Sequence, residues 1–149
     1  MSARKKVSIE KPSKIPGYII YEVGEHAFEI PDYYEVYAPL GQGAYGIVVL
    51  ATPPPSKKKN PRKTFFFYSK TTLRNGLNKK TNENVAIKKN FAVFEHDREY
   101  QKRILREMKI LMHLRNHPNI VSLRDVVRPD SFESFNDVYF ITDLMEIGL

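Results

Sequence analysis

Three glycines stand within six residues of the segment GQGAYGIVVLA, at Gly41, Gly43 and Gly46, and a run of apolar residues follows them. A dinucleotide-binding loop has the same glycine spacing, but there the glycines lead into a helix. Here the residues Ile47–Val49 are β-branched, so they favour a strand over the start of a helix. We therefore predict that the cluster is the turn of a hairpin, and that a phosphate beneath it would be held by backbone amides of the turn.

Several short apolar runs elsewhere in the chain predict further strands. They alternate in polarity or are rich in β-branched and aromatic residues, and they lie at Tyr18–Val23, His26–Ile30, Tyr37–Leu40, Gly46–Ala51, Asn84–Lys89, Ile120–Val127 and Val138–Met145. Gly24 separates the first two of these runs, which therefore read as a hairpin.

One long helical pattern, Glu95–His117, lies among the strands. Its apolar residues recur at steps of three and four, at Tyr100, Ile104, Met108, Leu111 and Met112. Asp97 is a candidate cap at the start of this helix, and Pro118 is expected to end it. Strands around a single helix, joined by short connections, indicate an α+β fold in which an antiparallel sheet carries a helix on one face.

Two segments lie outside these patterns and are charged. Residues 1–16 are polar and basic, and we expect a disordered tail there. Residues 52–77 contain seven lysines and arginines and no acid, a surplus equal to the net charge of +7 of the whole chain. Because this charge is confined to one proline-rich loop, it indicates a solvated insertion, and we do not expect nucleic acid as a partner.

The size and the missing residue types exclude several classes of protein. A chain of 149 residues, 42% of them hydrophobic, suits one compact unit. It has no cysteine, which excludes disulfides and thiolate metal sites, and we expect no metal ligands in this chain. Its basic N-terminus lacks the apolar core of a signal peptide, and no apolar stretch approaches about twenty residues, so we expect no membrane contact and a cytoplasmic protein. The nucleus is a second expected location.

Lys88 and Glu107 are two charged residues that lie next to apolar positions of a predicted strand and of the predicted helix. Each could be a simple surface residue or part of a binding site. Lys88 ends the strand segment VAIK, so its ammonium group must either reach water at a sheet edge or find an anion. Glu107 borders the apolar stripe of the helix, and its alternative is a surface pair with Arg103. A glycine hairpin, a strand lysine and a helix glutamate in this order favour an anion-binding site shared by the three elements.

These segments together resemble the N-terminal lobe of a protein kinase, and more narrowly that of a mitogen-activated protein kinase of the extracellular-signal-regulated branch. The matching stretches are GQGAYGIV, NVAIKK, FEHDREYQKRILREMKIL, HPNIV and VYFITDLME. The resemblance runs from about Tyr21 to Met145 and implies a five-stranded antiparallel sheet with one long helix, preceded by an N-terminal hairpin. Residues 17–149 would form this lobe, with 52–77 as a loop insertion, and the second lobe would be absent.

The resemblance also implies a role for individual residues at the phosphate end of an ATP site. Gly41, Gly43 and Gly46 would cover the phosphates, and Lys88 would hold the α- and β-phosphates. Glu107 would orient Lys88 through an ion pair that forms only when the helix is swung toward the sheet.

The adenine end of the site is implied in the same way. The residues expected to enclose the ring are Leu40, Val48 and Ala86. Thr142 would be the gatekeeper at the back of the site. The carbonyl of Asp143 and the amide of Met145 would bond to adenine.

The chain also departs from the family pattern. It contains no H-R-D catalytic loop and no D-F-G metal site, so the Mg²⁺ ligands are expected in the missing lobe and the chain alone is expected to be inactive. Its parent would be a serine/threonine kinase of a signalling cascade, with protein substrates and an upstream MAP kinase kinase.

Alternatives to this interpretation stay open at the level of sequence. A truncated, non-catalytic kinase-like binding module is one, and a nucleic-acid binder acting through the basic loop is a weaker one. Residues 52–77 are either a misread stretch of gene sequence or a real basic docking loop.

Overall fold

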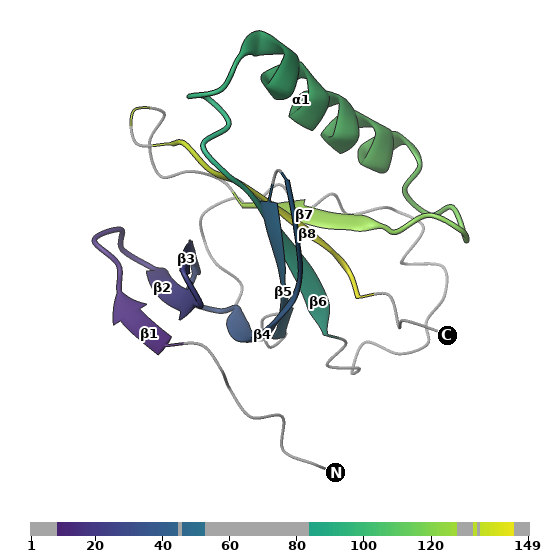
Figure 1. The fold of residues 1–149 in the computed structure, drawn as a ribbon. Coiled ribbons are helices and arrows are strands. Elements are labelled where there is room, and N and C mark those ends of the chain that lie inside the picture. Colours follow the sequence, from purple (N-terminus) through teal and green to yellow (C-terminus); the bar gives the residue numbers. More distant parts are fainter. Residues whose placement is uncertain (1–8, 45, 53–83, 128–132, 134, 145–149) are drawn as a thin grey trace.

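The computed structural model describes residues 9–44, 46–52, 84–127, 133 and 135–144 (Figure 1). These residues form eight strands and one helix: β1 Ile9–Pro12, β2 Tyr18–Val23, β3 His26–Pro31, β4 Glu35–Gly43, β5 Gly46–Thr52, β6 Val85–Asn90, α1 Arg98–His113, β7 Leu123–Val126 and β8 Val138–Asp143. The insertion predicted at 52–77 lies, apart from its first residue, outside the described residues.

The strands form two antiparallel sheets. One has three strands in the order β1-β2-β3, and the other has five in the order β4-β5-β6-β8-β7. Figure 1 shows α1 along one side of the five-stranded sheet and the three-stranded sheet beside it. The predicted α+β fold is therefore confirmed, with its five-stranded antiparallel sheet, its single long helix and its N-terminal hairpin.

Strand β1 is an addition to the predicted hairpin. Ile9–Pro12 lies within the segment 1–16 for which we expected a disordered tail, and for these four residues that expectation is wrong. They pair with β2 in register from Ile9 opposite Glu22 to Pro12 opposite Ile19, and Lys11 forms an ion pair with Glu22. All four residues are exposed, so backbone pairing holds the strand and core burial does not.

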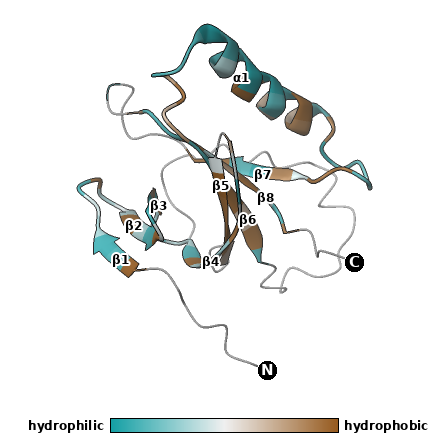
Figure 2. Cartoon of the chain, viewed as in Figure 1, coloured by the Kyte–Doolittle hydropathy of each residue, from teal (hydrophilic) through white to brown (hydrophobic). Residues whose placement is uncertain are grey.

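The five-stranded sheet buries a different set of residues on each face. One face packs against β2 and β3 around Phe28, Ile30, Val49, Ile87 and Ile141, all of which are almost completely buried. In Figure 2 the central strands β5 and β6 are among the most hydrophobic parts of the chain, as expected for the middle of a sheet that packs against a second layer.

Helix α1 covers part of the opposite face. Tyr100 and Ile104 are buried there with Phe140 of β8, and the other three predicted stripe residues pack against this cluster while remaining partly exposed. The predicted cap is confirmed, since the Asp97 carboxylate accepts a hydrogen bond from the Tyr100 amide at 2.8 Å. Within the described ranges, no helix is long and apolar enough to cross a membrane.

The end of α1 differs from the prediction. The helix ends at His113, four residues before the predicted end at His117, and Leu114 is its C-terminal cap. Asn116 then adopts a φ of 77°, in the left-handed region that interrupts a helix. The backbone of the Leu114–His117 turn therefore ends the helix before Pro118 is reached.

Lys89 connects the two sheets, which the sequence analysis did not predict. It is 8% exposed, and its ammonium group donates to the Ala27 carbonyl of β3 and lies 2.9 Å from the Asp137 carboxylate. Three aromatic rings lie 5.6–5.9 Å from the same nitrogen, those of Phe28, Phe91 and Tyr139. Hydrogen bonding, charge pairing and cation–π contact together compensate for the loss of hydration of the ammonium group.

Candidate functional site

Lys88 and Glu107 meet between the central strand of the sheet and α1. The Lys88 Nζ lies 2.7 Å from Glu107 Oε1, and each side chain is about one-third exposed, at 33% and 34%. The contact predicted for these two residues is therefore present. The alternative of a lysine at a sheet edge is wrong, because β6 lies in the middle of the five strands.

The exposure of this ion pair limits its strength. At about one-third exposure the two charges remain partly hydrated, and such a pair contributes about 1 kcal/mol or less. It therefore fixes the direction of the Lys88 ammonium group without locking α1 against the sheet.

The strand register places the other predicted residues on the same face of the sheet. Val48 lies opposite Lys88 across β5 and β6, and Ala86 lies opposite Thr142 across β6 and β8. Opposed residues of an antiparallel pair project to the same side, and so do residues two apart in a strand. Val48, Ala86, Lys88 and Thr142 thus share the face on which α1 lies.

The three glycines of the hairpin differ in whether the surrounding structure would tolerate a side chain at their position. A Cβ atom on Gly46 would lie 2.2 Å from the carbonyl oxygen of Lys89, so packing against β6 alone excludes a side chain there. A Cβ on Gly41 or Gly43 would meet nothing within 4 Å, and neither residue has a φ in the left-handed region. Neither packing within the described residues nor backbone conformation requires glycine at these two positions, so the space above the backbone can admit a ligand.

The adenine end of the predicted site is described only in part. Leu40 is 44% exposed on β4, before Gly41. At the end of β8 the Thr142 hydroxyl donates to the Asp143 carbonyl at 3.3 Å, and the Asp143 carboxylate pairs with Arg124. Met145 lies outside the described residues.

The fit of these residues to ATP can be tested on the structure. A lysine held by a carboxylate lies one strand from a glycine hairpin whose first two glycines leave free space. Apolar and small side chains flank that lysine on the same face. A cation, a glycine hairpin with free space above its backbone and an apolar wall are groups that a nucleotide site uses, so the described residues fit this ligand. Among the described residues, no three His, Asp or Glu side chains come together as a metal-binding group.

A buried carboxylate lies on the other face of the sheet. Asp125 is 6% exposed, and burial raises its pKa to about 6, although a hydrogen bond from the Val126 amide acts in the opposite direction. Burial, and to a smaller extent the nearby Asp125 carboxylate, also raises the pKa of Tyr34. Asp125 lies opposite Ile141, which faces the three-stranded sheet, so it does not belong to the Lys88 site.

Comparison with known proteins identifies the family of the chain. The protein kinase domain family matches residues 69–149, more than half of the chain. The chain belongs to the protein kinase family.

Within that family the chain is similar to mitogen-activated protein kinases. It is 39% identical over 133 residues to mitogen-activated protein kinase 10 of Arabidopsis thaliana, covering 89% of this chain and 27% of the relative. It is 37% identical over 143 residues to mitogen-activated protein kinase homolog 1 of Petunia hybrida, covering 95% of this chain and 30% of the relative. The resemblance to mitogen-activated protein kinases inferred from the motifs is thus confirmed, and the chain spans about three-tenths of the length of these relatives.

Proposed function

We propose that this chain is the ATP-binding N-terminal lobe of a mitogen-activated serine/threonine kinase. The observation that carries the proposal is the contact between Lys88 and Glu107 at 2.7 Å, on the sheet face that also holds Val48, Ala86 and Thr142. A strand lysine oriented by a helix carboxylate beside a glycine hairpin is the arrangement that kinases use to hold the phosphates of ATP.

Each described residue has a part in this proposal. Lys88 binds phosphate oxygens, and Glu107 keeps the ammonium group directed at them. Gly41 and Gly43 allow the hairpin backbone to approach the phosphates, while Gly46 fits the hairpin against β6. When bound, Mg-ATP supplies the phosphoryl group, and ligands for the Mg²⁺ would come from protein beyond this chain.

At the other end of the site, Leu40, Val48 and Ala86 enclose the adenine ring. Thr142 borders the back of the site, and backbone groups of Asp143 and Met145 bond to the base. The identity and position of these residues support the assignment through the family resemblance, since the register in β5, β6 and β8 groups Val48, Ala86 and Thr142 on one face.

The role of the parent protein is also part of the proposal. It would phosphorylate serine and threonine residues of protein substrates, after activation by a MAP kinase kinase, in the cytoplasm and the nucleus. The relatives that support this role are mitogen-activated protein kinases, of which the chain covers only about three-tenths.

Titration of the chain with ATP and with adenosine tests the phosphate contact. We expect weak ATP binding, in the millimolar range, because this chain supplies only part of the site. Lys88→Met should reduce ATP affinity about tenfold, which corresponds to the loss of one charge-assisted hydrogen bond, and should leave adenosine affinity unchanged. NMR shift changes on an isotopically labelled chain measure both affinities.

Lys14→Met is the matched control, because it removes an exposed lysine between β1 and β2. It should bind both ligands as the unmodified chain does. If Lys88→Met keeps the original ratio of ATP to adenosine affinity, Lys88 is not a phosphate ligand and the proposed site is wrong.

A further inference from the structure

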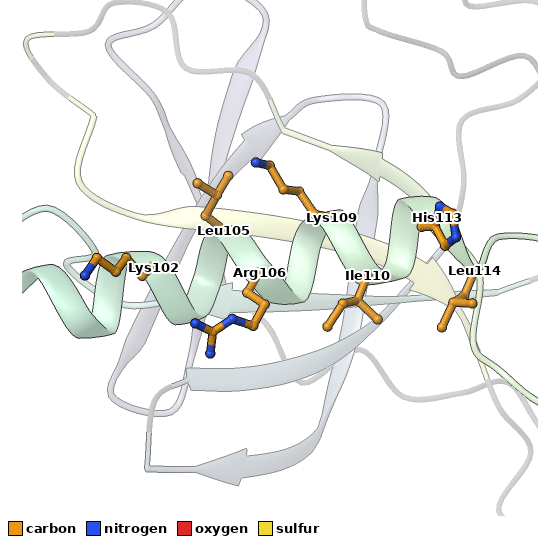
Figure 3. Close-up of a pocket in the computed structure, with 7 residues that line it drawn as sticks. All are labelled: Lys102, Leu105, Arg106, Lys109, Ile110, His113 and Leu114. Atoms are coloured by element: carbon orange, nitrogen blue, oxygen red, sulfur yellow. The ribbon is translucent and has the colours of Figure 1, made fainter.

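The side of α1 that faces away from the sheet forms a shallow groove, which we call the outer groove (Figure 3). It has a volume of about 490 Å³, and its polar lining consists of Lys102, Arg106, Lys109 and His113. Among the residues that the structure describes, no acidic side chain lines it. The buried residues of α1, Tyr100 and Ile104, point to the opposite side of the helix, so the outer groove contributes nothing to the core.

The four basic residues form a continuous row along the helix. They are spaced by four, three and four residues, which places their side chains next to one another on one side of α1. Like charges at this spacing weaken a helix, whereas opposite charges strengthen it. The pair formed by Glu99 and Lys102 at 2.7 Å is such a favourable contact, but only at the beginning of the row.

Further along the row the charge is not compensated. Within the described part of the chain, Arg106 and Lys109 form no ion pair with a carboxylate. A helix face that only meets water usually mixes both signs of charge. A row of one sign therefore favours a ligand that carries the opposite sign.

Large apolar side chains flank the basic row. Leu105 is 46% exposed and Ile110 is 49% exposed. Figure 3 shows Leu105 on the opposite side of the helix axis from Ile110 and Leu114, with Lys109 extending on the Leu105 side and Arg106 on the Ile110 side. Two apolar borders around a basic row match a segment that carries apolar and acidic residues together.

We propose that the outer groove binds an acidic amphipathic segment of a partner protein. Its carboxylates pair with Arg106 and Lys109, and its leucine or isoleucine side chains cover Leu105 and Ile110. A second copy of this chain does not fit through the same surface, because its own outer groove would bring the same positive charges. Nucleic acid leaves Leu105 and Ile110 uncovered, because its outer surface is a phosphate backbone.

A labelled synthetic peptide tests the proposal. The probe is an amphipathic helical peptide with glutamates on one side and leucines on the other, and its binding to the full chain is measured by fluorescence anisotropy. We expect binding that falls at least tenfold in two variants, one with Arg106→Glu and Lys109→Glu and one with Leu105→Ser and Ile110→Ser. All four residues are exposed, so circular dichroism should show that both variants keep the fold.

Control ligands and a control variant separate this site from general charge attraction. Lys14→Glu introduces a negative charge at an exposed position outside the outer groove and should bind the peptide as the unmodified chain does. A peptide of the same composition with its leucines and glutamates scrambled should bind at least tenfold more weakly. A single-stranded oligonucleotide should not displace the ordered peptide.

Three results would overturn the proposal. One is equal binding of the ordered and scrambled peptides, and another is full competition by the oligonucleotide, since both indicate nonspecific attraction. The third is binding to this chain but not to the longer parent protein, which would show that the remainder of the parent polypeptide fills the outer groove. Because the readout does not involve nucleotide, failure here leaves the proposed ATP site untouched.

Discussion

Replacing Asp125 by asparagine is expected to stabilise the chain at neutral pH and to destabilise it near about pH 4. Asp125 is 6% exposed, on the face of the sheet that packs against β2 and β3, and its carboxylate accepts a hydrogen bond from the Val126 amide at 2.8 Å. Burial raises the pKa of Asp125 from 3.8 to about 6. The ionised carboxylate is thus the unfavourable form in the folded state.

The size of the effect follows from the linkage between protonation and folding. A difference of about two pKa units corresponds to about 3 kcal/mol, at about 1.4 kcal/mol per unit. Below about pH 4 both states hold the proton, so Asp125 costs nothing. As the pH rises, the unfolded chain releases its proton first, and stability is lost until the folded carboxyl group ionises near about pH 6.

Asparagine removes this pH-dependent cost but adds another. Its carbonyl oxygen can still accept from the Val126 amide, while its buried amino group costs about 1 to 2 kcal/mol if it finds no acceptor. The net effect of Asp125→Asn is therefore a loss of about 1 to 2 kcal/mol near pH 4 and a gain of about 1 to 2 kcal/mol at pH 7.

Urea unfolding followed by circular dichroism, at several pH values between about 4 and 8, measures this change of sign. The difference between variant and unmodified chain is the informative quantity, because contributions from all other titrating groups cancel in it. Asp32→Asn, at an exposed position, is the control for the aspartate-to-asparagine substitution itself. A flat difference for Asp125→Asn would show that the buried carboxyl group is not perturbed, and would refute the reasoning.

Three further substitutions test the packing of the fold by urea unfolding. Gly46→Ala should cost about 1 to 3 kcal/mol, because its Cβ would lie 2.2 Å from a carbonyl oxygen of β6, whereas Gly43→Ala should change stability by less than about 0.5 kcal/mol. Lys89→Met should lower the free energy of unfolding by about 2 kcal/mol, because it removes a buried ammonium group that has a carboxylate and a carbonyl partner. An unchanged stability would mean that this contact is not formed. Asp97→Ala should cost about 1 kcal/mol through the lost helix cap, while Asp97→Asn should restore most of it.

The helix and the central strands could be predicted because their apolar residues repeat with the period of the element that they form. Tyr100 and Ile104 are buried as the stripe of α1 requires, and Ile87 and Ile141 are buried within the strands predicted for them. The contact between Lys88 and Glu107 was predicted from the order of the motifs and from the family resemblance. Both kinds of evidence can link residues far apart in the sequence, which a local periodic pattern cannot do.

Other features depend on contacts that leave no local signal in the sequence. Strand β1 is held by backbone pairing, and its residues Ile9–Pro12 are all exposed, so they show no apolar alternation. Asp125 is buried on the face opposite to Leu123 because the register shifts between these two residues. A regular strand would place residues two apart on the same face, and Asp125 would then lie on the face that carries α1.

The two adjacent lysines of β6 show how one strand connects the predicted and the unpredicted parts of the structure. Since successive side chains of a strand point to opposite faces, Lys88 reaches Glu107 of α1 while Lys89 enters the aromatic cluster against the three-stranded sheet. The burial of Lys89 on one face fixes the position of β6, and that position sets where the Lys88 ammonium group lies on the other. The N-terminal sheet therefore supports the candidate nucleotide site through β6, although none of its residues contacts Lys88 or Glu107 among the described interactions.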